Sequence, residues 1–252
     1  MSDALLRQVL AQNAVDTGAG SPVLQVRATL LPVLQRWGGK YIRSVEPSGS
    51  FAKGTAVRSG TDIDLFVSLR ADTPETLEQI YNSLLSTLSS AGFQPRRQDV
   101  SVGLRISGAW DVDVVPARHQ GNAGNDHSLY TSRRGSWMQT NVAQHISVVR
   151  QSSRLDEIKL IKIWRNARRL DFPSFFLELS VIRALSGNRS NNLSANVVAA
   201  LEFLRDQIAT VRIVDPANSN NAVSDAATVA EKRAIAAAAK AALSGTWEQL
   251  FA

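Results

Sequence analysis

Two short apolar segments, each carrying an Asp-x-Asp pair, constrain this chain more than any other feature. They are DIDLFVSL, which starts at Asp62, and WDVDVVP, which starts at Trp110. Successive side chains of a strand point to opposite faces, so Asp62 and Asp64 share one face while the apolar residues beside them point into a core. Asp111 and Asp113 repeat this geometry. If the two strands are neighbours, up to four carboxylates meet on one solvated face of a sheet.

Such a cluster predicts a bound divalent cation. Carboxylates held close together repel one another unless a positive charge offsets them. The chain has no Cys and only 3 His, so a cation that prefers oxygen ligands is expected, either Mg²⁺ or Mn²⁺. Two such ions per site are the arrangement used for phosphoryl transfer. For either Asp-x-Asp pair taken alone, the solvent-facing side of an edge strand remains an equal interpretation.

The sequence just before the first pair strengthens the phosphate interpretation. Gly49 and Ser50 end a predicted strand and open a short predicted helix, with Lys53 close by. Backbone N–H groups and a hydroxyl at such a point can receive a phosphate. A Gly-Ser turn, a short helix, an Asp-x-Asp strand and a later Asp-bearing strand, in that order, form a specific signal.

The chain is expected to be α+β and to change character near residue 140. Strands and helices alternate in the first part, a polar stretch over 118–140 has no clear period, and the remainder is predicted to be helical. We therefore expect a catalytic core over 1–140 and a helical domain over 141–252. The expected strands cover 41–45, 62–69, 100–107 and 110–116, and the expected helices cover 22–37 (kinked or interrupted at Pro32), 75–91, 155–168, 174–185, 194–208 and 225–243.

Positive charge is concentrated in one part of the sequence. The net charge is +6, but residues 133–169 contain nine basic and two acidic residues, which leaves the rest almost neutral. A basic surface suits phosphate-rich ligands, although a solvated helix face would look the same. No segment has the length and apolarity of a membrane span or a signal peptide, so we expect a cytoplasmic protein without a membrane partner.

The stretches GSFAKGTAVRSGTDIDLFV and DVDVVPA resemble the nucleotidyltransferases of the DNA polymerase β-like superfamily. The similarity is greatest to its template-independent branch, which includes oligoadenylate synthases, archaeal-type CCA-adding enzymes and the bacterial cGAS/DncV-like enzymes (CD-NTases). LDEIKLIKIWRN, FPSFFLELSVIRAL and VDPANSNNAV also agree, so the resemblance spans about residues 22–230. It implies a core of mixed sheet flanked by helices, followed by a helical C-terminal domain that binds nucleotide.

The resemblance also implies roles for individual residues. Gly49 and Ser50 would hold the nucleotide phosphates, and Asp62, Asp64 and Asp113 would be the catalytic ligands of two metal ions. Asp111 would be outside the ligand set.

Further nucleotide contacts are implied in the helical part. Lys162 in LIKIW would contact the triphosphate, with Lys159 on the same helical face, and Ser174 would be a second phosphate contact. Phe175 occupies the position of an aromatic ring against the base, although packing in the core is an equal interpretation.

The expected activity is template-independent transfer between NTPs, with ATP among the substrates, to make a cyclic oligonucleotide messenger of bacterial antiphage signalling. The chain lacks a Cys/His zinc insertion and the long tail that embraces tRNA in CCA-adding enzymes. One alternative is an enzyme that adds nucleotides to the 3′ end of RNA or tRNA, with RNA as acceptor or activator. Another is a non-catalytic nucleotide- or RNA-binding module, which has no need of three carboxylate ligands.

Overall fold

The computed structural model describes residues 3–60, 62–106, 110–121, 124–246 and 250–251. Its chain divides into two compact units, and both are discontinuous in sequence. The sheet unit comprises residues 16–53 and 62–146, and the helical unit comprises residues 1–15, 54–61 and 147–252. A single boundary near residue 140 was expected, whereas two earlier segments of the chain belong with the helical unit.

The sheet unit is built on a mixed sheet. Within the described residues its strands are β1 (Ile42–Pro47), β2 (Ile63–Leu69), β3 (Arg96–Arg97), β4 (Val102–Ile106), β5 (Trp110–His119), β6 (His127–Thr131) and β7 (Ser136–Thr140). The order is β1-β2-β5-β4-β3, and β6 pairs with the end of β5 and with β7. Only β2 and β5 pair in parallel among these strands. The strands of the two Asp-x-Asp segments are thus direct neighbours, which is the condition for a shared carboxylate face.

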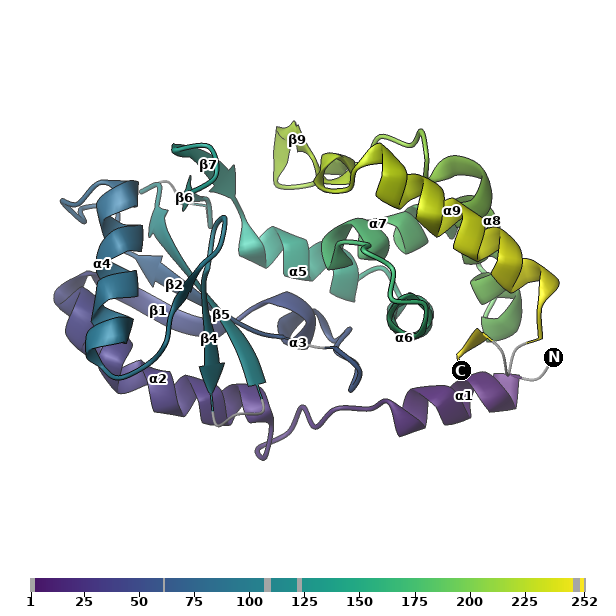
Figure 1. The fold of residues 1–252 in the computed structure, drawn as a ribbon, viewed down its shortest axis with the longest axis horizontal. Helices are drawn as coiled ribbons and strands as arrows, with labels where there is room; N and C mark the ends of the chain where they lie inside the picture. Colours follow the sequence, from purple (N-terminus) through teal and green to yellow (C-terminus); the bar gives the residue numbers. More distant parts are fainter. Residues whose placement is uncertain (1–2, 61, 107–109, 122–123, 247–249, 252) are drawn as a thin grey trace. The chain divides into compact units, whose positions relative to one another are not determined.

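Helices α2 (Pro22–Gly38) and α4 (Leu77–Ser90) pack on each other and on this sheet (Figure 1). Their apolar side chains Leu30, Leu34 and Leu84 are fully buried. The short helix α3 (Gly49–Lys53) packs on β2. Helices α2 and α4 bury one side of the strands. The polar side chains that alternate along β2 and β5 are therefore not needed for packing against these helices.

The helical unit contains α1 (Asp3–Gln12), α6 (Leu155–Ala167), α7 (Ser174–Ala184), α8 (Leu193–Gln207) and α9 (Val229–Ser244), and α5 (Val142–Arg150) runs across the division at residue 146. Its core is large and aromatic. Trp164 and Phe176 are almost completely buried, and Phe172 meets Phe176 edge to face at 5.2 Å. Leu6 of α1 belongs to the same core, so the N-terminal helix is part of this unit.

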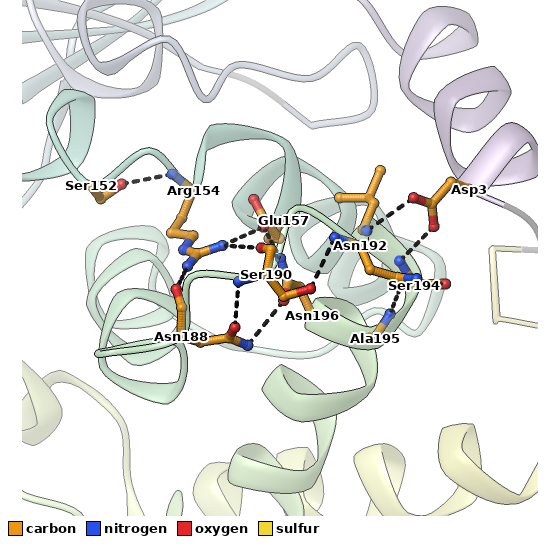
Figure 2. Close-up of polar contacts among 11 residues, drawn as sticks. Asp3, Ser152, Arg154, Glu157, Asn188, Ser190, Asn192, Ser194, Ala195 and Asn196 are labelled. Carbon is orange, nitrogen blue, oxygen red and sulfur yellow. Dashed lines mark hydrogen bonds and ion pairs between the residues drawn. The ribbon is translucent and has the colours of Figure 1, made fainter.

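A buried polar network ties α1 and the start of α8 to α6 (Figure 2). Glu157 accepts hydrogen bonds from Arg154 at 3.2 Å and from Asn196 at 2.7 Å. Asp3 accepts from the backbone N–H groups of Leu193 and Ser194, the first turn of α8. We call Arg154, Glu157 and Asn196 the Arg154 cluster.

Several expectations about secondary structure were wrong. In the polar stretch over 118–140, residues 127–140 form the β6–β7 hairpin, and within VDPANSNNAV residues 214–222 form a second hairpin of β8 (Val214–Asp215) and β9 (Asn218–Ala222). Hairpin pairing stabilises strands whose own sequence shows no period. The short helices η1 (Gly39–Tyr41) and η2 (Val223–Ala226), together with α1 and α5, had not been expected. The turn expected at Gly108–Ala109 lies outside the described residues.

Of the two outcomes expected at Pro32, a kink or an interruption, the interruption is wrong, because α2 is continuous from residue 22 to 38. Pro32 lies on the exposed side of α2, so water can solvate the carbonyl of Ala28 that loses its N–H partner. Among the described residues, the helices are all too short or too polar to span a bilayer.

Candidate active site

The carboxylates of the two Asp-x-Asp pairs lie on neighbouring strands of the sheet unit. Parallel pairing of β2 and β5 sets Asp64 directly opposite Asp113 and Ile63 opposite Val112. The side chains of Ile63 and Val112 are fully buried, whereas Asp64 and Asp113 are half-buried. The alternation of a strand thus places two carboxylates side by side at the rim of the core.

The carboxyl of Asp113 is difficult to ionise at this rim. Burial raises the pKa of the Asp113 carboxyl above its ordinary value, and the charge of Asp62 raises it further. Hydrogen bonds from the side chains of Gln98 and Ser101 offset part of this increase. Asp62 therefore raises the pKa of Asp113, although Asp62 lies just before β2 and Asp113 lies on β5. Ionising all of these groups together is unfavourable without a cation.

Gly49 stands directly against this carboxylate pair. Its φ is +55°, and a Cβ added to it would lie 1.7 Å from Oδ2 of Asp64. The backbone N–H of Ser48 donates to the carbonyl of Asp64 at 2.8 Å. Only glycine permits both this conformation and this close approach. The Gly49-Ser50 segment and the first Asp-x-Asp pair therefore form a single local site.

Asp111 and Lys53 complete the expected residues of the sheet unit. Asp111 forms an exposed ion pair with Arg96 at 2.8 Å, and its place outside the ligand set stays a prediction. Lys53 is buried, with 8% of its surface exposed, at the end of α3. Its role as a nucleotide contact stays a prediction.

The chemistry of these donors fits a divalent cation, but the ligands are not preassembled. Considering only the described part of the chain, no three His, Cys, Asp or Glu side chains are grouped closely enough to bind a metal. Asp62, Asp64 and Asp113 nevertheless offer carboxylate oxygens in a place where negative charge already raises a pKa. Mg²⁺ and Mn²⁺ prefer such oxygens. A cation bound there would offset the repulsion among these carboxylates.

The two lysines of the helical unit that were expected to contact nucleotide both lie beside a carboxylate. Lys162 is buried, and its ammonium lies 2.6 Å from Oε1 of Glu178. Lys159 is half-buried and pairs with Asp156 at 3.6 Å. Residues 133–169 were expected to form a basic surface, but Lys162 in this segment is buried and Lys159 is half-buried.

Ser174 and Phe175 begin α7. Ser174 is exposed, and its hydroxyl accepts a hydrogen bond from Arg165 at 2.9 Å. Phe175 is half-buried against the helical core, which leaves part of the ring accessible. The nucleotide-binding roles of Lys159, Ser174 and Phe175 stay predictions.

Sequence reasoning missed several partners of the expected residues in each unit. Gln98 and Ser101 bond to Asp113, Arg165 bonds to Ser174, and Glu178 pairs with Lys162. Gln98 and Ser101 lie in a loop without a motif, so no pattern indicates them. Glu178 does carry a signal, because a lone carboxylate inside the apolar run FFLELSV has to find a cation.

The chain is similar to known nucleotidyltransferases. Residues 28–115 match the family model described as nucleotidyltransferase domain. A curated protein of Escherichia coli (strain MS 115-1), cyclic AMP-AMP-AMP synthase, is 27% identical across 72% of this chain and 69% of its own length.

Solved structures share the fold at lower identity. The Bradyrhizobium diazoefficiens CD-NTase CdnG in complex with GTP superposes with a TM-score of 0.76 at 14% identity, covering 98% of this chain and 92% of that one. The Cid1 poly(U) polymerase with Mg and 3′-dATP gives 0.71 at 13% identity, covering 98% and 97%. The expected α+β fold is confirmed, and the chain is an NTP-using nucleotidyltransferase that is similar in sequence to a cyclic AMP-AMP-AMP synthase and in fold to a CD-NTase.

Proposed function

We propose that this protein joins NTPs, with ATP among them, into a small cyclic oligonucleotide without a template or an RNA acceptor. The observation that carries the chemistry is the local site in which Gly49 contacts Asp64 and Asp64 lies opposite Asp113. The similarity to a cyclic AMP-AMP-AMP synthase supports the class of product.

In this proposal, Asp62, Asp64 and Asp113 hold two Mg²⁺ ions, for which Mn²⁺ can substitute. Bound there, the ions supply positive charge that neutralises the phosphates and acidifies the attacking hydroxyl. The raised pKa of Asp113 supports this assignment, because it reflects burial of the carboxyl and, in addition, the negative charge of Asp62, which a bound cation would offset.

The chain's own residues bind and orient the nucleotides. The bare backbone at Gly49 lets a phosphate approach the carboxylates, and the Ser50 hydroxyl donates a hydrogen bond to it. Ser174, exposed and held by Arg165, donates to a nucleotide phosphate, and Phe175 stacks on a base. The 3′-hydroxyl of one nucleotide attacks the α-phosphorus of another, the bond to the bridging oxygen breaks, and pyrophosphate leaves.

The test is incubation of the purified protein with the four NTPs and Mg²⁺ or Mn²⁺, with and without RNA. Products are treated with phosphatase and identified by chromatography and mass spectrometry. The proposal expects a phosphatase-resistant oligonucleotide formed without RNA, and its loss in Asp113→Asn but not in Asp111→Asn.

Addition of nucleotides to the 3′ end of an RNA is the second candidate. The shared fold with the Cid1 poly(U) polymerase favours it. If only added RNA gains nucleotides and no resistant product forms with any NTP or metal, this second function replaces the first.

A further inference from the structure

Thr55, Lys162 and Glu178 form a buried polar cluster inside the helical unit, which we call the Thr55 cluster. The Thr55 hydroxyl donates to Oε1 of Glu178 at 2.7 Å and accepts from the Lys162 ammonium at 3.0 Å. Lys162 and Glu178 lie 2.6 Å apart. Thr55 and Glu178 are completely buried, and Lys162 is 2% exposed. The hydroxyl's single proton and an acceptor position are thus both used within this ion pair.

Stability alone does not require such a cluster. A buried ion pair gains little over an apolar pair of the same volume, because desolvation of both charges opposes their attraction. The core around it already contains large apolar side chains such as Trp164 and Phe176. The two charged side chains instead fix the position of the Thr55 hydroxyl, because hydrogen bonds to charged partners are strong and directional.

The segment that carries Thr55 is held by the helical unit at further points. The backbone N–H of Arg58 donates to the carbonyl of Asn13 at 2.9 Å. Asn166 of α6 donates to the carbonyl of Ser59. Ala56 and Val57 are buried. Residues 54–60 are therefore held to the helical unit by both side-chain and backbone hydrogen bonds, and they group with that unit.

The residues on both sides of this segment belong to the active site of the sheet unit. Ser50 precedes Thr55 by five positions, and Asp62 follows it by seven. Since the chain is continuous, the place of this segment limits where both ends can lie. A small misplacement of reacting groups lowers the rate strongly even when binding persists.

From this arrangement we infer that the Thr55 cluster is a positioning device, which sets Ser50 on one side and the Asp62–Asp64 pair on the other. This inference rests on the proposed use of those residues for nucleotide transfer. It gives Lys162 a role different from the expected one. The Lys162 ammonium is used by Glu178 and Thr55, and it acts on catalysis through the segment rather than by contacting the triphosphate.

The test compares Thr55→Val, Thr55→Ser, Lys162→Met and Glu178→Gln with a matched control, Glu157→Gln. Glu157 is also a buried carboxylate on a cation, in the Arg154 cluster (Figure 2), and its bonds are to Arg154 and Asn196 rather than to residues 54–60. Pyrophosphate release gives kcat and KM for NTP, and melting temperatures report folding. Amide hydrogen exchange over 49–64 in the full-length, nucleotide-free protein gives a readout independent of activity.

We expect Thr55→Val to lower kcat about ten- to a hundredfold with KM within about threefold, and Thr55→Ser to stay close to wild type. Lys162→Met and Glu178→Gln should show the same split, and exchange should rise in 49–53 and 62–64 as well as at residue 55. The control should lower the melting temperature while leaving kcat and this exchange unchanged.

Two results would overturn the inference. If Thr55→Val behaves like the control, the cluster only stabilises the fold. If Lys162→Met raises KM for NTP while Thr55→Val does not, Lys162 contacts the triphosphate. Should the wild type transfer no nucleotide under any condition, the proposed function fails, whereas the exchange of 49–53 and 62–64 in Thr55→Val still decides the positioning claim.

Discussion

The two units of this protein differ in how the negative charge of their buried and half-buried carboxylates is offset. In the helical unit, the deeply buried carboxylates Glu178 and Glu157 each have a cation of the same unit beside them, Lys162 and Arg154 respectively. In the sheet unit, Asp64 lies opposite Asp113, and Asp62 adds further negative charge. Charge neutralised within the chain fixes structure, whereas charge concentrated at the rim of a core requires a ligand.

The sharpest test of this contrast is Asp113→Asn compared with Asp111→Asn on the same strand. The amide that replaces the Asp113 carboxylate cannot offer a charged ligand, so we expect pyrophosphate release to fall by at least about 10³-fold. Asp111 is paired with exposed Arg96, and its loss should change the rate less than about threefold. Urea unfolding of both variants without nucleotide should show no loss of stability in Asp113→Asn. Comparable activity in the two variants would contradict the ligand assignment.

Gly49→Ala should have the next largest effect. The added methyl group would lie 1.7 Å from the Asp64 carboxylate in a backbone conformation that alanine disfavours. We expect a loss of activity of about 10²-fold or more, because Ser50 and Asp64 are displaced together. Gly135→Ala, also at positive φ but with open space around it, serves as the control and should remain active. Equal activity of both variants would show that the contact with Asp64 is dispensable.

Removing a cation from the helical unit should destabilise the fold, unlike removing a carboxylate from the sheet unit. Lys162→Met leaves buried Glu178 without its charge partner, which costs about 3–5 kcal/mol of unfolding free energy. Arg154→Met should cost less, because Asn196 still donates to Glu157. Urea titrations of both variants measure this. Loss of stability in Asp113→Asn that equals the loss in Lys162→Met would remove the contrast between the units.

The smallest expected effect is a pH dependence inside the sheet unit. Burial lowers the pKa of His127 below its ordinary value of 6.5. The unfolded chain therefore binds a proton before the folded one does, and stability falls as pH decreases from above 6.5 through the lowered pKa. Its ring bonds to Ser68 and to the carbonyl of Asn125.

Melting temperatures of wild type and His127→Gln, measured from about pH 7.5 down to about pH 5, test this dependence. The wild type should lose more stability than the variant over that interval. The same slope in both proteins would show that His127 does not contribute.

The sequence predicted the parts of this protein in which local pattern and burial agree. Helices α6, α7 and α8 begin and end within one residue of expectation, because their apolar faces recur at helical spacing. Strands β2 and β5 were evident from alternation, and the pairing that a shared carboxylate face requires is present. The family resemblance, the fold class and the nucleotidyltransferase activity are confirmed by comparison.

The features that escaped prediction depend on contacts between distant positions. The hairpins at 127–140 and 214–222 are stabilised by pairing, and no periodicity in either stretch indicates them. Residues 54–61 belong to the helical unit, in which the Thr55 hydroxyl bonds to Glu178, 123 positions later in the chain. The roles of the individual site residues stay predictions.

The discontinuity of the helical unit restricts how this protein can be rearranged by evolution or by an engineer. A gene fragment beginning at residue 147 would lack Leu6, and it would lack the threonine that bonds to the Lys162–Glu178 pair. Such a fragment would therefore expose part of its core, and its buried Lys162–Glu178 pair would lose the hydroxyl that bonds to both side chains. The helical half is thus not a cassette that can be exchanged among related enzymes at a single junction. A functional swap would have to carry α1 and residues 54–61 along with it, which requires three coordinated replacements.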